Sequence, residues 1–275
     1  MAVPAERLSL NTATVRDQWH LRQCVEGCVR HGFGGIAPWR DKLAGIGIAE
    51  AERMISDSGL AVTGLCRGGM FVAADPAGRQ RALDDNRRAI DEAAAIGARC
   101  LVLVVGGLAA GSKDLVAARG HVHDGIAATL EHARAAGVPL AIEPLHPMYA
   151  ADRACVNTMA QANDLCDELG AGLGIAVDVY HVWWDPDLEA EIARAGADRI
   201  LAFHICDWLV PTRDLLLDRG MMGDGVIDIP KIRGWLTATG YQGLAEVEIF
   251  SAENWWRRDP DEVLATIIDR AATAV

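Results

Sequence analysis

The architecture of the chain is clearest in one segment, Gly174-Ile175-Ala176-Val177-Asp178-Val179-Tyr180-His181-Val182-Trp183-Trp184. Its first half is a short, almost continuous apolar run, which is typical of a strand covered on both faces in a parallel sheet. The run ends in Asp178, and His181 follows three residues later. Both residue types bind metal ions. The segment therefore predicts a barrel strand that carries metal-binding side chains at its carboxyl end.

Three further segments have the same design, an apolar run that ends in one carboxylate or imidazole. They are residues 139–143, 200–204 and 243–248. They place Glu143, His204 and Glu248 at strand ends like that of Asp178. If these four strands are neighbours in a parallel barrel, their ends converge above its axis, where barrel enzymes have their active sites. Glu246 alternates with Glu248 on the last strand, so both carboxylates are candidates to point inward.

Two glutamates, one aspartate and one histidine form a hard, oxygen-rich set of ligands. Such a set suits one divalent ion, Mn²⁺ first and Mg²⁺ or Co²⁺ as alternatives, better than a structural zinc. An ion held by four side chains keeps about two coordination positions free, enough for the carbonyl and adjacent hydroxyl of a sugar. As a Lewis acid it stabilises the enediolate that forms when the α-proton leaves.

The rest of the chain repeats the alternation of strand and helix. We expect strands at residues 8–12, 33–39, 59–65, 98–105, 139–143, 174–178, 200–204 and 243–248. We expect helices at residues 16–30, 48–58, 81–96, 120–136, 158–169, 188–195, 229–239 and 259–272. Eight such units predict an α/β fold, a single (β/α)8 TIM barrel domain over residues 1–275. Residues 66–71 are expected to be loop, and residues 205–228 are a long excursion, either a lid or a partner-binding arm.

Composition excludes several classes of function. The net charge of −12 and the lack of a basic stripe argue against a nucleic-acid partner. No uncharged apolar run approaches the roughly 18 residues that span a bilayer, and the start has no signal peptide, so we expect a cytoplasmic protein without membrane contact. The seven scattered cysteines are expected to be reduced thiols in the core.

With these residues the chain resembles the xylose isomerase-like barrels, a family of sugar isomerases, sugar epimerases and inosose-processing enzymes. The resemblance extends from Leu8 to about Ile268, and four motifs carry it in the family's order. They are Glu143-Pro144, Asp178-Val179-Tyr180-His181, His204-Ile205-Cys206-Asp207 and Glu248-Ile249-Phe250. The resemblance implies one divalent metal ion on Glu143, Asp178, His204 and Glu248. It also favours Glu248 over Glu246 as the last ligand.

The resemblance implies the catalytic roles as well. Glu143 and Glu248 correspond to the family's usual pair of acid and base on opposite sides of the metal. The family often has a further glutamate shortly after the first, whereas this chain has residues 146–153, which begin with His146. His146 is therefore a candidate to take over one of the two proton transfers.

Substrate contacts follow from the same comparison. His181 is expected to hold a substrate hydroxyl. Arg219, which precedes Gly223-Asp224-Gly225, resembles the family's arginine that reaches substrate oxygens, and Arg213 is its rival. Trp183, with the tryptophan after it, forms either a sugar-stacking wall or the rim of the barrel.

The expected function is that of an isomerase or epimerase acting on a small sugar, a keto-sugar or a cyclitol ketone. The first alternative is a lyase, the metal-binding catalytic subunit of a C-glycoside deglycosidase that acts on 3-oxo-glycosides. The missing second glutamate, His146 and the aromatic rim favour this alternative, which requires a small partner subunit. The second alternative is a non-catalytic barrel subunit, against which the intact ligand set counts. We expect either a homo-oligomer or a complex with a small partner subunit.

Overall fold

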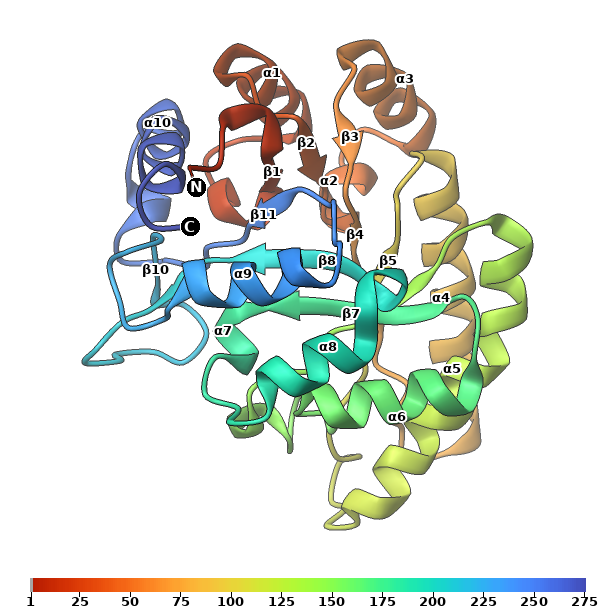
Figure 1. Ribbon diagram of the computed structural model, residues 1–275. Helices are drawn as coiled ribbons and strands as arrows, with labels where there is room; N and C mark the ends of the chain where they lie inside the picture. The colour runs from red at the N-terminus through yellow and green to blue at the C-terminus, as the bar shows by residue number, and fades with distance from the viewer. Residues whose placement is uncertain (1) are drawn as a thin grey trace.

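The computed structural model describes residues 2–275, in which parallel strands form one curved sheet surrounded by helices (Figure 1). The strands of this sheet are β1 (Leu8–Asn11), β2 (Gly35–Ala37), β3 (Ala61–Val62), β4 (Leu65–Gly69), β5 (Leu101–Val104), β6 (Leu140–Ile142), β7 (Leu173–Asp178), β8 (Ile200–Ile205) and β11 (Ala245–Val247). They are neighbours in the order β3-β2-β1-β11-β8-β7-β6-β5-β4. Only Thr63 and Gly64 separate β3 from β4 in the chain, so the two ends of the sheet are halves of one strand. The sheet is thereby closed into a barrel.

Helices cover the outside of this barrel (Figure 1). They are α1 (Leu21–His31), α2 (Arg40–Ala44), α3 (Ile48–Ser58), α4 (Pro76–Ala95), α5 (Leu115–Ala136), α6 (Met159–Leu169), α7 (Val179–Val182), α8 (Leu188–Arg199), α9 (Ile229–Ala238) and α10 (Pro260–Ala271). Four 3₁₀ turns accompany them, η1 (Ala5–Arg7), η2 (Thr12–Val15), η3 (Pro147–Tyr149) and η4 (Trp255–Arg257). The predicted TIM barrel architecture is confirmed. Among residues 2–275, none of the helices combines the length and the apolar character that crossing a membrane requires.

The interior of the barrel is filled by small side chains, and the larger apolar residues pack between strands and helices. The inner group consists of Cys66, Cys100, Val102, Ala141, Ala176 and Ala202. Small residues here leave room for polar side chains on the neighbouring strands, among them the buried Ser9, Thr63 and Glu246. All seven cysteines are free and buried, as expected.

The third strand differs from the prediction. Residues 66–71 were expected to be loop, but β4 continues through Gly69 and pairs with β5. The register shifts between Cys66 and Gly68, so Arg67 is the extra residue of a β-bulge. A bulge lets a strand continue past an irregular residue while turning that residue's side chain in a new direction. The expectation of a loop was wrong because the glycines support this bulge and do not end the strand.

Three helices begin five residues away from their predicted starts. The first begins at Leu21 and not at residue 16, because His20 caps it and residues 12–15 form η2. Helices α4 and α5 begin at Pro76 and Leu115, five residues before the predicted starts. Asp75 and Asp114 cap them by accepting hydrogen bonds from backbone N–H groups. An aspartate just before a helix, followed at Asp75 by a proline, is a sequence signal for a helix start, and the prediction did not use it.

The long excursion after β8 contains regular structure. Strand β9 (Asp207–Trp208) pairs antiparallel with β10 (Arg219–Gly220). The Asp207 carboxylate accepts hydrogen bonds of 2.9, 2.9 and 3.0 Å from the backbone N–H groups of Gly223, Gly225 and Ile227. The buried Asp207 carboxylate thus stabilises the turn that follows β10. This turn keeps Arg219 near the carboxyl ends of the barrel strands.

Candidate metal centre

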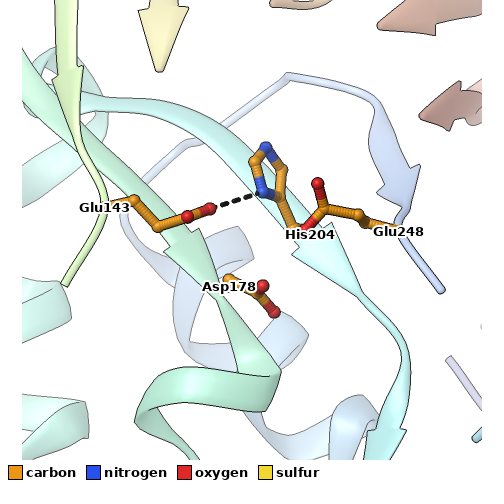
Figure 2. Close-up of side chains that lie close together, drawn as sticks. All are labelled: Glu143, Asp178, His204 and Glu248. Carbon is orange, nitrogen blue, oxygen red and sulfur yellow. Dashed lines mark hydrogen bonds and ion pairs between the residues drawn. The ribbon is translucent and has the colours of Figure 1, made fainter. Parts of the chain in front are cut away.

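Four side chains from adjacent strands meet at the carboxyl end of the barrel (Figure 2). Glu143 follows β6, Asp178 ends β7, His204 lies in β8 and Glu248 follows β11. Asp178 and His204 are direct partners in the register of β7 and β8. Each of the four residues offers one ligand atom, and these atoms lie within 4.8 Å of one another. The structure therefore brings together the four residues expected from the sequence, in a group that could hold a metal ion.

The charges of this group fit a divalent cation. All four residues are buried, and Asp178 and His204 are fully inaccessible. Burial raises the pKa of the Glu248 carboxyl to about 8. The positive charge of Arg219 lowers this pKa, and the negative charge of Glu143 raises it further. Three carboxylates crowded into a dry site are costly without a positive partner, and an oxygen-rich set of this kind is the preferred environment of Mn²⁺, Mg²⁺ and similar ions.

His204 is oriented by a carboxylate on each side of its ring. Its Nδ1 lies 3.0 Å from Oε1 of Glu143 (Figure 2), and its Nε2 lies 3.3 Å from Oε1 of Glu246. The second contact is an ion pair without good hydrogen-bond alignment. Burial alone would lower the pKa of His204, but Glu246, Glu143 and Glu248 raise it well above its ordinary value. Nδ1 is thus the nitrogen that faces the other three ligand candidates, and Nε2 faces away from them toward Glu246.

Asn11, at the end of β1, connects the two glutamates of the last strand. Its Nδ2 donates to Oε1 of Glu246 at 2.8 Å and to Oε1 of Glu248 at 2.9 Å. Its Oδ1 accepts from Trp39 Nε1 at 2.8 Å, which fixes the orientation of the amide. Both glutamates therefore point inward, as expected. The sequence reasoning missed Asn11, although a polar residue at the end of the first apolar strand was a usable signal.

Arg219 lies buried beside the four candidate ligands. Its Nη1 donates to Oδ2 of Asp178 at 2.9 Å and to Oε2 of Glu248 at 3.2 Å. Its Nη2 lies 3.2 Å from Nε2 of His181. Arg213, the rival considered from the sequence, pairs with Asp218, and its own side chain is 61% exposed. Of the two arginines, Arg219 is the one next to the metal group.

His181 is held as a neutral ring. Its Nδ1 accepts a hydrogen bond of 3.3 Å from the backbone N–H of His146, and its Nε2 lies 3.6 Å from Oδ2 of Asp178. Burial lowers the pKa of His181 to about 3, against the raising effect of Asp178. Nε2 faces two different groups, Nη2 of Arg219, which can only donate, and Oδ2 of Asp178, which can only accept. His181 is thus an uncharged ring that lines the cavity beside Arg219.

A cavity of about 400 Å³ opens above the metal group. Glu143, Glu248, His181 and Arg219 line it, together with the aromatic rings of Trp39, Tyr149, Phe250 and Trp256. Asp178 and His204 are fully buried beneath it and are not among its lining residues in the described part of the chain. The cavity thus reaches two of the four candidate ligands, Glu143 and Glu248.

Two candidates from the sequence lie elsewhere. The ring of His146 packs between Trp184 and Trp208, and its Nδ1 accepts from the backbone N–H of Met148. Trp183 packs against Trp208. Within residues 2–275, neither His146 nor Trp183 is among the residues that line the cavity. The aromatic wall of the cavity comes instead from Trp39 and Trp256 of other loops.

The chain matches the model of the xylose isomerase-like TIM barrel family over residues 25–267 and belongs to this family. The structure of protein SMc04130 from Sinorhizobium meliloti 1021 is 63% identical, with a TM-score of 0.97 and 98% of each chain covered. The structure of an IolI protein with a bound zinc atom has a TM-score of 0.83 at 19% identity, over 98% of this chain and 99% of that one, and shares the fold.

A curated relative is the inosose isomerase of Halalkalibacterium halodurans. It is 26% identical over 153 residues, which are 53% of this chain and 51% of that protein. The chain thus spans about half the length of this curated relative. The protein is thus a xylose isomerase-like TIM barrel with a group of four buried side chains that could hold a metal ion.

Proposed function

We propose that this protein is a divalent-metal-dependent isomerase or epimerase. Its substrate would be a small sugar, a keto-sugar or a cyclitol ketone, from which it removes the proton next to the carbonyl group. One observation carries this proposal: Glu143 and Glu248 belong to the metal group and also line the cavity. Proton transfer requires a carboxylate within hydrogen-bonding reach of the substrate. Glu143 and Glu248 meet this condition, whereas Asp178 is sealed beneath the cavity.

Each residue of the site has a task in this proposal. Glu143, Asp178, His204 and Glu248 would hold the ion, which supplies a Lewis acid for the carbonyl and an adjacent hydroxyl of the substrate. One glutamate removes the α-proton, and the other returns it, to the opposite face in an epimerase. His181, which lines the cavity, would hold a substrate hydroxyl. Arg219 would exchange part of its contact with Asp178 and Glu248 for substrate oxygens.

We propose Mn²⁺ as the metal, with Mg²⁺ and Co²⁺ as alternatives, because three of the four ligand side chains are carboxylates. The zinc in the IolI structure belongs to that protein. The likeness to an inosose isomerase supports cyclitol ketones as one substrate class to test. The neutral wall of Trp39 and Trp256 suits the apolar face of a sugar or cyclitol ring.

The lyase alternative loses one of its supports. It relied in part on His146 as an added catalytic group, and the ring of His146 packs against Trp184 and Trp208. Its remaining supports are the missing second glutamate and the aromatic rim, and an isomerase uses such a rim equally well. We therefore favour the isomerase or epimerase, and aglycone release from a 3-oxo-glucoside is the observation that would reverse this preference.

The test is incorporation of solvent deuterium into ketohexoses, inososes and 3-oxo-glucosides by the Mn²⁺-loaded protein in D₂O. Wild type should exchange the α-proton of at least one free sugar or cyclitol ketone. Glu143→Gln and Glu248→Gln should each lower the rate by about 10²–10⁴-fold at saturating Mn²⁺, the usual contribution of an acid or base.

Two controls separate proton transfer from metal binding. Asp178→Asn removes a ligand that does not reach the cavity, so it should weaken Mn²⁺ binding in calorimetry but keep more exchange at saturating metal than either glutamine variant. Glu253→Gln removes an exposed carboxylate that pairs with Arg257 and should behave as wild type. Undiminished exchange in both Glu143→Gln and Glu248→Gln would refute the assignment.

A further inference from the structure

The cavity is lined by four arginines and by three carboxylates, Asp17, Glu143 and Glu248, and not every arginine has an acidic partner in the part of the chain that the structure describes. Arg16, Arg67 and Arg153 line the cavity in addition to Arg219. Arg219 is offset by Asp178 and Glu248, and Arg16 by Asp41 at 3.2 Å. Among the described residues 2–275, the acidic partner of Arg153 is Asp152, at 3.9 Å, and the Arg153 guanidinium lies 5.6 Å from the Tyr149 ring centre. This accumulation stands out in a chain with a net charge of −12.

Arg67 is the most exceptional of these arginines. Within residues 2–275 its guanidinium forms no hydrogen bond or ion pair, although the side chain is mostly covered and lines the cavity. Burial and the nearby charge of Arg153 both lower the pKa of the Arg67 guanidinium. A partly desolvated cation without a partner costs free energy. Such a group is expected where a ligand supplies the missing negative charge.

The position of Arg67 is built into the fold. Arg67 is the extra residue of the β4 bulge, which turns its side chain toward the cavity. The buried Asn86 of α4 clamps the bulge, since its Oδ1 accepts from the Gly69 N–H and its Nδ2 donates to the Gly69 carbonyl, both at 2.7 Å. Gly69 has a φ of +102°, and a Cβ there would lie 2.0 Å from the Val104 carbonyl oxygen. Only glycine fits this position, so the close approach of the bulged strand to Val104 depends on Gly69.

We propose that the substrate of this site carries an oxyanion group, a carboxylate or a phosphate, which binds between Arg67 and Arg153 while its carbonyl end faces Glu143 and Glu248. This inference rests on the proposed function, because it names the class of sugar that the same cavity accepts. Guanidinium groups bind both oxyanions through paired N–H donors. A neutral sugar would offer Arg67 hydroxyl acceptors but no compensating negative charge.

The experiment compares three classes of substrate on the Mn²⁺-loaded full chain at low salt. They are neutral sugars (glucose, fructose, an inosose), uronic acids (glucuronate, galacturonate) and sugar phosphates (glucose 6-phosphate, fructose 6-phosphate). Deuterium exchange gives kcat and KM, and intrinsic tryptophan fluorescence gives binding, because Trp39 and Trp256 line the cavity. The class of substrate with the lowest KM identifies the anion as a carboxylate or a phosphate.

The variants test the role of the arginines. In wild type, KM for the preferred anionic sugar should be at least about tenfold below that of its neutral counterpart, as expected for a charge-assisted contact. Arg67→Gln should raise this KM about tenfold or more with kcat little changed, and Arg153→Gln provides a second variant should the first fold poorly. Arg87→Gln removes one exposed positive charge from α4 and should leave KM unchanged.

The two proposals fail in different ways. Equal KM values for neutral and anionic sugars, unaffected by Arg67→Gln, would overturn the oxyanion inference and leave the isomerase proposal intact. Absence of exchange with every substrate would overturn the proposed function. In that case fluorescence titration with glucuronate and glucose 6-phosphate tests the oxyanion inference. Binding to wild type that is lost in Arg67→Gln would support the inference. Absence of binding to wild type would refute it.

Discussion

Glu246 faces the side of the His204 ring that points away from the metal group, with its Oε1 3.3 Å from Nε2. The two residues are direct partners in the register of β11 and β8. Thr63 and Asn11 donate to the same carboxylate at 2.6 and 2.8 Å, so it cannot turn toward the cavity without breaking both hydrogen bonds. Glu246 is thus a buried carboxylate that fixes which nitrogen of His204 is offered to a metal.

We predict that Glu246→Gln weakens metal binding while the fold is kept. The substitution preserves size and removes the charge beside Nε2, and the amide oxygen can still accept from Asn11 while the amide nitrogen donates to the Thr63 hydroxyl. Partners of this kind usually contribute 10–100-fold to metal affinity, so the Kd for Mn²⁺ should rise by about that factor. Calorimetric titration of wild type, Glu246→Gln and the exposed control Glu253→Gln measures it. An unchanged Kd in Glu246→Gln would show that the contact is only structural.

Metal binding should stabilise the protein more as the pH rises from about 5 to 8. The folded pKa of Glu248 is raised from 4.5 to about 8, and that of His204 is also raised. When folding raises the pKa of a group, the bound proton stabilises the metal-free folded protein. This stabilisation is complete below the pKa of the group in the unfolded state, and it is lost as the pH rises through the pKa in the folded state. A metal requires the deprotonated groups, so its binding has the opposite dependence.

Thermal unfolding with and without Mn²⁺ at pH 6, 7 and 8 tests this dependence. The difference in Tm between the Mn²⁺-bound and the metal-free protein should increase from pH 6 to pH 7 and again from pH 7 to pH 8. A difference that stays constant or narrows would mean that Glu248 and His204 do not compete with the metal for protons.

Asn86→Ala should destabilise the protein through the β4 bulge. The change leaves the buried N–H and carbonyl of Gly69 without partners. Each unsatisfied group costs about 1–3 kcal/mol, so we expect the free energy of unfolding to fall by about 2–4 kcal/mol. Gln80→Ala, on the exposed side of the same helix, should change it by less than about 0.5 kcal/mol. Denaturant titration measures both, and equal values would contradict the role of Asn86.

The cysteines should be unreactive in the folded protein. All seven are buried, and burial raises the pKa of each thiol, so very little thiolate is present near pH 8. Titration with a chromogenic disulfide reagent should detect almost no thiol in the native state and seven in guanidinium chloride. Rapid reaction of a native thiol would show that part of the barrel opens on the time scale of the assay.

The sequence by itself determined the fold class and the four gathered side chains. Apolar runs and helix patterns are local, and in a regular alternation consecutive parallel strands become neighbours. A carboxylate or imidazole at the end of each of four such strands must therefore lie near the others, as Glu143, Asp178, His204 and Glu248 do. The order of residues along the chain was enough for this conclusion.

The tertiary structure alone decided what surrounds that group. His146 follows Glu143 by three residues, yet its ring packs with Trp184 and Trp208 because η3 turns it away from the cavity. Arg67 lies far from the ligands in the chain, yet it reaches the cavity because a bulge clamped by Asn86 turns it inward. The direction of a side chain in a loop or bulge depends on packing between distant segments, and no local pattern of residues contains that information.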